Sequence, residues 1–273
     1  MDMDKKQIEE VRAHYDEAPV MEWDRLEKEP FEFELTTYMM DQYIRPGDAV
    51  LDIGGGPGRY AIHYARKGCA VTLAELSLGN VEYAKAKARE AGVDFPAYAV
   101  NCLELDELGL GQFDHVFLMG PLYHLQEEAD RRTAVQIALD HLKPGGKLYV
   151  SFIQLFGGLI YDLQHEGHIC EDMAIPACRK LVEGVPKGKD YSGPGFTAVY
   201  FYHLRNILPF MERFPLKKLH LFGQEGFLAP NKLQLMERSP EEFAQWVELA
   251  KQYIEVPELL SWSEHIMYIG EKE

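Results

Sequence analysis

The 273-residue sequence predicts an α/β protein built on a doubly wound, mostly parallel sheet, and three observations lead to this prediction. Short apolar segments alternate with helix-forming segments between residues 49 and 152. Glycines follow several of the helical segments, where they can end a helix. The segment 113–119 is almost continuously apolar, as expected of a strand covered on both faces. Strand–helix alternation at this pitch is typical of a parallel sheet with helices on both faces.

The elements of the predicted sheet can be placed in chain order. Ser77 is positioned to cap a helix, and Gly68 and Gly92 are positioned to end two of them. The expected strands are 49–53, 70–75, 95–100, 113–119 and 147–152, and the expected helices between them are 58–67, 79–91 and 127–142.

The segments before and after this region are less regular. We expect a helix at 4–16, a loop containing Pro19, Trp23 and Arg25, and a helix at 31–43. Glycine-rich turns within 153–195 predict an inserted cap. The expected later elements are a strand at 196–202, a helix at 203–213, a strand at 216–222, a helix at 240–255 and a strand at 264–269. The expected organisation is a helical cap (1–44), a core (45–152 and 196–273) and a substrate cap (153–195) within one structural domain.

Composition and charge narrow the class of protein. With 47% hydrophobic and 26% charged residues, the chain is typical of a globular protein. It carries 44 acidic against 28 basic residues, a net charge of −16, which disfavours a nucleic-acid partner. The sequence has neither an apolar signal core at its N-terminus nor an apolar run of about 18 residues. We therefore expect a cytoplasmic protein with no membrane partner, acting as a monomer or homodimer.

The most informative segment is the glycine-rich loop after the first strand, Asp52-Ile-Gly54-Gly55-Gly56-Pro-Gly58. Glycines packed this densely let the backbone turn sharply and approach a ligand. A dinucleotide fingerprint is excluded by its spacing, because Arg59 stands where the third glycine should be. A phosphate-binding loop is excluded because no Lys-Ser or Lys-Thr pair follows.

Two other strand ends supply polar groups at the same edge of the sheet, where ligands of open parallel sheets bind. The second strand ends in Glu75, 21 residues after Gly54, where a carboxylate can accept hydrogen bonds from ribose hydroxyls. A surface acid with a structural role is the alternative. The fourth strand leads into residues 119–124, which place Tyr123 and His124 at the mouth of the predicted site.

Together these segments resemble the class I S-adenosylmethionine-dependent methyltransferases. The resemblance covers residues 45–152 and extends more loosely to 269. Its motifs are Asp52-x-Gly54-x-Gly56-x-Gly58, Val71-Thr-Leu-Ala-Glu75-Leu-Ser77 and Leu142-Lys-Pro-Gly-Gly-Lys-Leu148. Two softer matches, Gly120-Pro-Leu-Tyr-His-Leu125 and Glu22-Trp-Asp-Arg-Leu26, resemble a subgroup of bacterial small-molecule methyltransferases.

The resemblance implies a seven-stranded Rossmann-like sheet, S-adenosylmethionine as cofactor and S-adenosylhomocysteine as product. The implied cofactor-binding residues are Tyr15, Asp52, Gly54, Gly55, Gly56, Gly58, Glu75, Leu76, Asn101, Cys102, Leu103, Met119 and Gly120. One position departs from the family, which usually has an adenine-binding Asp after the third strand. Here Asn101 offers a side-chain oxygen instead, with Cys102 beside it to pack against the ring.

Methyl transfer from a sulfonium needs an aligned acceptor and, for an O or N acceptor, removal of a proton. We predict His124 as the base and Tyr123 as a positioning group, with a capping or packing role as the alternative for His124. Trp23, Tyr200 and His203 are candidate substrate residues, although Trp23 and Tyr15 also suit ordinary packing. The segment His165-x-x-His168-x-Cys170 matches no standard zinc spacing, so no metal is expected.

The sequence thus predicts an enzyme that methylates an O, N, S or C atom of a small molecule. Methylation of a protein or RNA is an alternative that the acidic charge disfavours. A catalytically silent protein that binds S-adenosylmethionine as a sensor or partner is another. A nicotinamide-dependent oxidoreductase is the last alternative, and the glycine spacing argues against it.

Overall fold

A computed structural model describes residues 5–17, 19–28, 30–164 and 168–273. Its centre is a seven-stranded sheet with the strand order β3-β2-β1-β4-β5-β9-β8. The first five strands pair in parallel, whereas β9 runs antiparallel to both β5 and β8. The strands of this sheet are β1 (Ala49–Ile53), β2 (Ala70–Glu75), β3 (Ala97–Ala99), β4 (Phe113–Leu118), β5 (Leu142–Ile153), β8 (Leu216–Gly223) and β9 (His265–Lys272). The predicted doubly wound, mostly parallel sheet is therefore confirmed.

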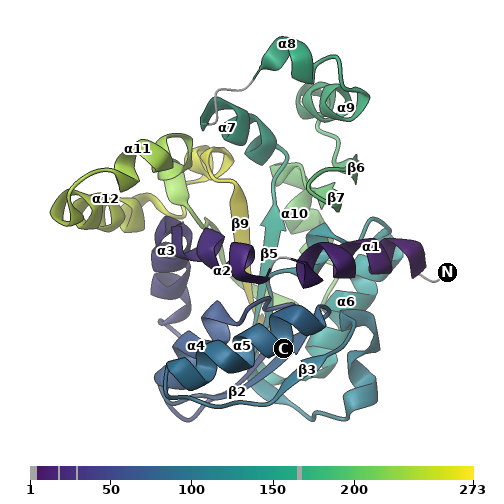
Figure 1. Cartoon of the computed structure of the whole chain (residues 1–273), viewed down its shortest axis with the longest axis vertical. Coiled ribbons are helices and arrows are strands. Elements are labelled where there is room, and N and C mark those ends of the chain that lie inside the picture. Colours follow the sequence, from purple (N-terminus) through teal and green to yellow (C-terminus); the bar gives the residue numbers. More distant parts are fainter. Residues whose placement is uncertain (1–4, 18, 29, 165–167) are drawn as a thin grey trace.

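Helices cover both faces of the sheet, and short helices border it (Figure 1). The first half of the chain contributes α1 (Lys5–Asp16), α2 (Pro19–Lys28), α3 (Pro30–Met40), α4 (Arg59–Arg66), α5 (Leu78–Glu90) and α6 (Glu128–Asp140). The second half contributes α7 (Phe156–Gln164), α8 (Ile169–Asp172), α9 (Pro176–Gly184), α10 (Leu204–Met211), α11 (Lys232–Met236) and α12 (Pro240–Tyr253). The 3₁₀ helices are η1 (Cys102–Leu108), η2 (Pro121–Tyr123), η3 (Val185–Lys187), η4 (Gly226–Asn231) and η5 (Pro257–Trp262).

The central strands divide the core into two halves by their alternation. Successive side chains of a strand point to opposite faces. Phe117 and Tyr149 pack with α3, α4, α5 and α12, whereas Val116 and Leu148 pack with α6 and α10 on the other face. All four side chains are fully buried. This two-sided burial explains why these segments are almost continuously apolar in the sequence.

The N-terminal region differs from its prediction between residues 19 and 28. The expected loop around Trp23 and Arg25 is the helix α2, which begins at Pro19. Proline is tolerated in the first turn of a helix, where its missing N–H would be unpaired in any case. The prediction was wrong because it read Pro19 as a loop residue. In Figure 1, α1 and α2 lie in front of the sheet, and both contact α5.

The region after β5 contains a second, small sheet. The predicted strand at 196–202 is β7 (Ala198–Phe201), which pairs antiparallel with β6 (Tyr191–Pro194) and does not join the main sheet. The expected boundary between substrate cap and core, at 195/196, falls within this hairpin. Figure 1 shows α7, α8 and α9 standing above the hairpin, away from β2 and β3.

Because β9 is antiparallel, its first residues lie at the edge where the parallel strands finish. His265, its first residue, is paired with Ile153 at the carboxyl end of β5. The neighbouring strand β8 finishes at the same edge, so that Gln224 and Glu225 follow it there. This edge therefore collects side chains from both halves of the sequence. Within the described residues, no helix is long and apolar enough to cross a membrane.

Candidate active site

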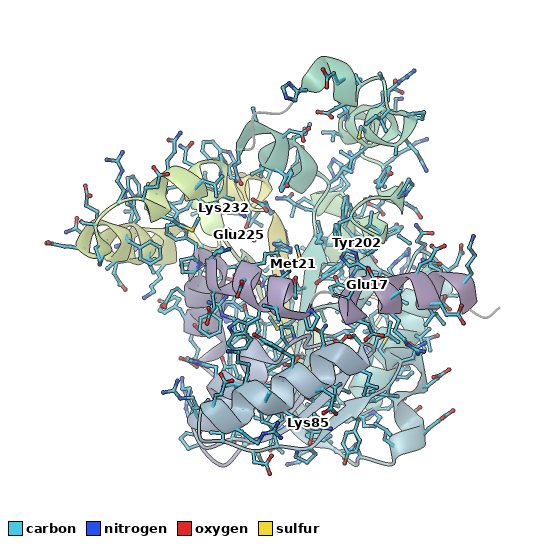
Figure 2. The ribbon with its side chains drawn as sticks, viewed as in Figure 1. Glu17, Met21, Lys85, Tyr202, Glu225 and Lys232 are labelled. Atoms are coloured by element: carbon cyan, nitrogen blue, oxygen red, sulfur yellow. The ribbon has the colours of Figure 1, made fainter. Side chains whose placement is uncertain are left out.

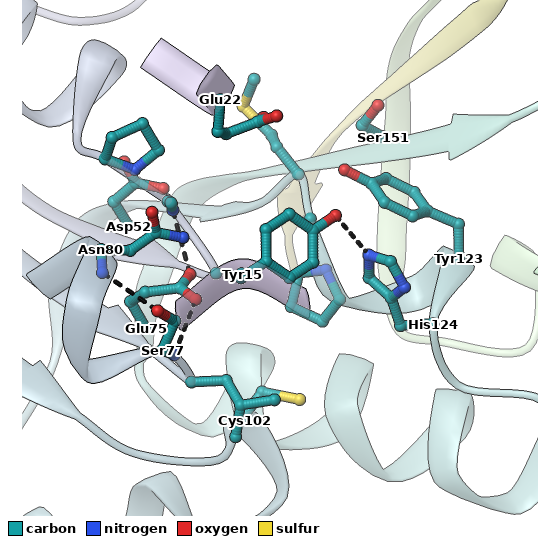
Figure 3. A pocket seen from close by; sticks show the side chains of 18 of the residues that line it. Tyr15, Glu22, Asp52, Glu75, Ser77, Asn80, Cys102, Tyr123, His124 and Ser151 are labelled. Atoms are coloured by element: carbon teal, nitrogen blue, oxygen red, sulfur yellow. Dashed lines mark hydrogen bonds between the residues drawn. The ribbon is translucent and has the colours of Figure 1, made fainter. Parts of the chain in front are cut away.

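A cavity lies beyond the carboxyl ends of β1, β2, β4 and β5 (Figure 3). Nearly all of the predicted cofactor-binding residues line it: Tyr15, Asp52, Gly54, Gly55, Gly56, Glu75, Leu76, Asn101, Cys102, Met119 and Gly120. Gly58 and Leu103 are sequence neighbours of lining residues but do not themselves line the cavity. Figure 3 places Glu75 and Ser77 on one side of the cavity and Tyr123 and Ser151 on the other.

The glycine loop has the backbone that its sequence suggests. Gly54, Gly56 and Gly58 have φ values of 70°, 54° and 82°, in the left-handed region that favours glycine. A Cβ at Gly56 would have only Asn80 Nδ2 nearby, at 4.0 Å, because that side of the residue faces the cavity. A Cβ at Gly120 would lie 2.5 Å from the Gly54 carbonyl oxygen. A side chain at Gly56 would enter the space available to a ligand, whereas a side chain at Gly120 would collide with the backbone of Gly54.

Glu75 is held by the loop and by the start of the next helix. Its carboxylate accepts hydrogen bonds from the backbone N–H of Gly56 and of Ser77, each at 3.0 Å. The side chain is buried, and burial raises the pKa of Glu75 while the backbone donors oppose that rise. The carboxylate therefore has a fixed orientation toward the cavity, as hydrogen bonding to two ribose hydroxyls requires.

Asp52 lies beneath the glycine loop and lacks part of its hydrogen bonding. Within the described part of the chain, its Oδ2 is buried without a hydrogen-bond partner, and so is Asn80 Oδ1. Burial and the charge of Glu75 raise the pKa of Asp52 to about 7. A cationic ligand group with N–H donors would satisfy both oxygens and stabilise the carboxylate. These features fit the ammonium and sulfonium end of S-adenosylmethionine.

After β3, Asn101 stands where the methyltransferase family usually has an adenine-binding Asp, and its side chain has a structural role here. Asn101 caps η1, because its side-chain oxygen accepts a hydrogen bond from the Leu103 backbone N–H at 3.1 Å. That oxygen is already engaged, although Asn101 still lines the cavity. Burial raises the pKa of the Cys102 thiol to about 12, so Cys102 is an uncharged packing group beside the cavity.

Tyr15 and His124 join three segments over the cavity. Tyr15 Oη lies 2.9 Å from His124 Nε2, and His124 Nδ1 lies 3.0 Å from Thr197 Oγ1 (Figure 3 shows the first bond). The Thr197 hydroxyl donates to the Ala198 carbonyl, so it accepts from Nδ1–H, and Nε2 accepts from Tyr15. Asp16 adds a second tie, accepting from the Ser77 hydroxyl at 2.6 Å. The end of α1 is thereby fixed over the cofactor residues.

This arrangement argues against His124 as the base. Both of its ring nitrogens are bonded within the protein, and burial lowers the pKa of His124 to about 4. It is a neutral imidazole that connects α1 with the β6–β7 hairpin. The adjacent Tyr123 does line the cavity, and burial raises its pKa, so its hydroxyl stays protonated and can donate a hydrogen bond.

The three predicted substrate residues lie outside the cavity. Trp23 packs against Tyr83 of α5, with ring centroids 6.1 Å apart. Tyr200 donates to Asp190 at 2.7 Å and lies under the Arg131 guanidinium. His203 caps α10. Their aromatic character reflects packing. His165 of the predicted non-metal segment lies outside the described residues.

Several further residues line the cavity that were not among the predicted site residues. They are Arg12, Glu22, Arg25, Glu32, Arg59, Ser151, Gln224 and His265. Ser151 follows the strand-end pattern of Glu75, which gave a usable signal. His265 lies at the start of an antiparallel strand. A search for site residues at the carboxyl ends of parallel strands therefore could not find it.

Comparison with known proteins agrees with the geometry. Residues 50–146 match the family model described as a methyltransferase domain. This match spans the glycine loop, Glu75 and the turn before the buried part of β5. Together, the match, the sheet and the cavity support a class I S-adenosylmethionine-dependent methyltransferase.

Individual relatives are distant. Ubiquinone biosynthesis O-methyltransferase of Erwinia tasmaniensis is 26% identical over 69% of this chain and 70% of its own length. Its Escherichia coli counterpart matches over 65% of its own length, so this chain corresponds to about two thirds of such relatives. Among solved structures, magnesium protoporphyrin IX methyltransferase from Synechocystis PCC 6803, with S-adenosylhomocysteine bound, has a TM-score of 0.59 at 14% identity, covering 98% of this chain and 100% of that one. 1,6-Didemethyltoxoflavin-N1-methyltransferase from Burkholderia thailandensis has a TM-score of 0.58 at 15% identity, covering 100% and 91%.

Proposed function

We propose that this methyltransferase transfers the methyl group of S-adenosylmethionine to a small molecule held in the same cavity. One observation carries the proposal: beyond the cofactor residues, the cavity continues beneath the N-terminal helices to Ser151 and His265. An acceptor end covered by the chain's own helices suits a small molecule better than a polymer. The net charge of −16 also disfavours RNA.

The residues around the cavity can be given roles in this reaction. Bound S-adenosylmethionine supplies an electrophilic methyl group on a sulfonium. Asp52, Glu75 and the glycine loop hold its two ends, and Tyr15 covers it from α1. Tyr123 orients the acceptor through its protonated hydroxyl. Most of the rate enhancement then comes from alignment of the acceptor atom with the methyl group.

The comparisons support a small acceptor without identifying it. By their names, the distant relatives act in ubiquinone biosynthesis and on 1,6-didemethyltoxoflavin. These names include one O-methyltransferase and one N1-methyltransferase, so both O and N acceptor atoms are compatible with the fold, and the acceptor atom stays open among O, N, S and C. A catalytically silent protein that binds the cofactor is the second candidate, since the loop and Glu75 support binding rather than turnover.

Two measurements separate these candidates. Calorimetric titration with S-adenosylmethionine, S-adenosylhomocysteine and NADH should give binding of the first two only. Transfer of label from methyl-labelled S-adenosylmethionine to members of a small-molecule panel, with RNA and cell protein as parallel acceptors, then tests turnover. Label found only in RNA or protein would refute the small-molecule proposal. Cofactor binding without transfer to any acceptor would favour the silent protein.

A further inference from the structure

The acceptor side of the cavity contains a histidine that the chain holds in one orientation. His265 Nδ1 lies 2.5 Å from Glu225 Oε1. Glu225 is 1% exposed and does not line the cavity, whereas His265 does. The carboxylate is therefore behind the ring, and Nε2 is the ring nitrogen available to a molecule in the cavity. A buried carboxylate that fixes an imidazole in this way sets both its tautomer and its orientation.

The carboxylate is itself fixed by several donors. Glu225 Oε2 accepts hydrogen bonds from the Ser263 hydroxyl and from the backbone N–H groups of Glu264 and His265. Such a network leaves no freedom for the carboxylate to rotate, and the imidazole inherits that rigidity. Figure 2 shows Glu225 close to Lys232, whose ammonium pairs with Glu264 at 2.9 Å.

Charges around His265 keep it protonated. Three acids lie close to His265: Glu225 in the loop after β8, Glu32 in α3 and the preceding residue, Glu264. Lys232 forms an ion pair with Glu264 and so balances part of their charge. Burial favours the neutral ring, but the charge and hydrogen bond of Glu225, together with the charges of Glu32 and Glu264, outweigh it and raise the pKa of His265 to about 9. At neutral pH, Nε2 therefore carries a hydrogen that it can donate into the cavity.

We propose that His265, oriented by Glu225, binds the acceptor's ionised oxygen through Nε2–H and balances its charge during methyl transfer. This inference rests on the proposed function. Because Nε2 already carries a hydrogen, the acceptor hydroxyl gives its proton to solvent when its oxygen pairs with the imidazolium. An oxygen lone pair then forms the new O–C bond, and the C–S bond breaks with its electron pair going to sulfur. The cofactor leaves as the uncharged thioether, and the imidazolium keeps its proton. The oxyanion–imidazolium pair has the same total protonation state, and the same pH dependence, as a hydroxyl beside a neutral imidazole.

The cavity favours an oxygen over an ammonium group at this position. Arg59 lies near His265 because both interact with Glu32, whereas the charge of Arg25 is neutralised by Glu22, with N–O distances of 2.7 and 2.9 Å. Glu32 is the opposing acid, and it also interacts with Arg59. A metal ion in place of the proton would have to displace the imidazole N–H from Glu225, whose oxygens already accept four donors.

A matched control is present on the same strand pair. His220 of β8 also pairs with a glutamate, since its Nδ1 lies 2.9 Å from Glu255 Oε1. Its Nε2, however, is bonded to the Tyr43 hydroxyl at 2.6 Å, and it does not line the cavity. His220→Gln thus removes a histidine–glutamate pair without touching the acceptor side.

The first test is methyl transfer to a panel of phenol, catechol, benzoic acid, benzylamine and thiophenol. We expect oxygen acceptors to be methylated, and His265→Gln to lower kcat/KM roughly 100-fold while leaving the calorimetric Kd for S-adenosylmethionine unchanged. Glu225→Gln should move the rising limb of the pH profile to lower pH by about one unit, and His220→Gln should change neither quantity. A purely structural role would not shift the pH profile. Methylation of the amine or thiol alone, or a rate for His265→Gln within about threefold of wild type, would overturn the proposal.

The second test does not need the true acceptor. In protein with ¹⁵N-labelled histidine and saturating S-adenosylhomocysteine, 4-nitrophenol should shift the His265 Nε2 resonance, and benzylamine should not. The resonance is assigned by its loss in His265→Gln. An unshifted resonance at saturating 4-nitrophenol, or displacement of the Nε2 proton by Zn²⁺ at micromolar concentration, would refute the role of His265. Failure to bind S-adenosylmethionine at all would instead refute the proposed function.

Discussion

The two sides of the cavity are built in different ways. The cofactor side comes from residues 52–58, 75–80 and 101–102, which are close in the sequence and act largely through backbone groups. The acceptor side joins Glu32, Ser151 and His265, which are far apart in the chain and act through side chains. A backbone-built site needs glycines and short spacings, which a sequence displays. A site assembled from side chains on distant elements needs only that those elements meet, which a sequence hides.

The largest effect on cofactor binding is expected at Gly56, in the backbone-built side of the cavity. Gly56→Val would place a branched side chain in the space that faces the cavity, where only Asn80 Nδ2 is nearby. We expect cofactor affinity to fall by more than roughly 100-fold, about 3 kcal/mol, in a calorimetric titration with S-adenosylhomocysteine.

Gly92→Val is the control, because Gly92 also has a positive φ, 72° against 54°, and has nothing within 4 Å of its Cβ position. Both variants share the backbone strain of a branched residue in the left-handed region. Wild-type affinity in Gly56→Val would show that the loop does not contact the cofactor.

A smaller effect is expected at Glu75. Glu75→Gln keeps the shape but replaces an acceptor-only carboxylate with an amide, so it repels one backbone N–H and loses one ribose contact. We expect affinity for S-adenosylhomocysteine to fall about 30-fold, roughly 2 kcal/mol, the size of a hydrogen bond to a charged group. Glu82→Gln, on the exposed side of α5, should bind like wild type, because its side chain is 64% exposed. Equal affinities in the two variants would remove Glu75 from the ribose site.

These contrasts also explain how much the sequence could predict. The sheet was predictable because Phe117 and Tyr149 belong to strands buried on both faces, and such strands must be apolar throughout. Gly54, Gly56 and Glu75 were predictable because their roles depend on backbone geometry and on strand ends. His124 was assigned as a base because its position at the mouth was visible, whereas its partners Tyr15 and Thr197 were not.

Contacts between residues far apart in the chain could not be predicted from the sequence, for a physical reason. Nothing local places Glu225 behind His265, since that contact depends on β9 running antiparallel beside β8. Likewise, Phe196–Tyr202 has the composition of a strand, but composition does not select which sheet it joins. Pro19 was misleading because the same residue begins both loops and helices.

The pH dependence of stability tests the charge state on the acceptor side. The pKa of His265 is raised to about 9 in the folded protein, so its stabilising contribution is full below the unfolded value near 6.5 and is lost as pH rises through about 9. We expect His265→Gln to cost roughly 1–2 kcal/mol near pH 6 and much less near pH 9.5. Urea unfolding at both pH values measures the difference. An equal cost at the two values would show that His265 is not paired as an imidazolium.

The smallest effect is expected where the two sides meet, at Tyr15. Its hydroxyl donates to His124 Nε2, which helps to keep the end of α1 over the cofactor residues. Tyr15→Phe removes that hydrogen bond and retains the ring. We expect the position of α1 over the cofactor to be less stable by about 1 kcal/mol. S-adenosylhomocysteine should then dissociate roughly 5-fold faster in a stopped-flow displacement experiment. Tyr98→Phe on β3, outside the cavity, is the control. Equal dissociation rates would mean that Asp16, through Ser77 and Gly79, holds α1 closed without help from Tyr15.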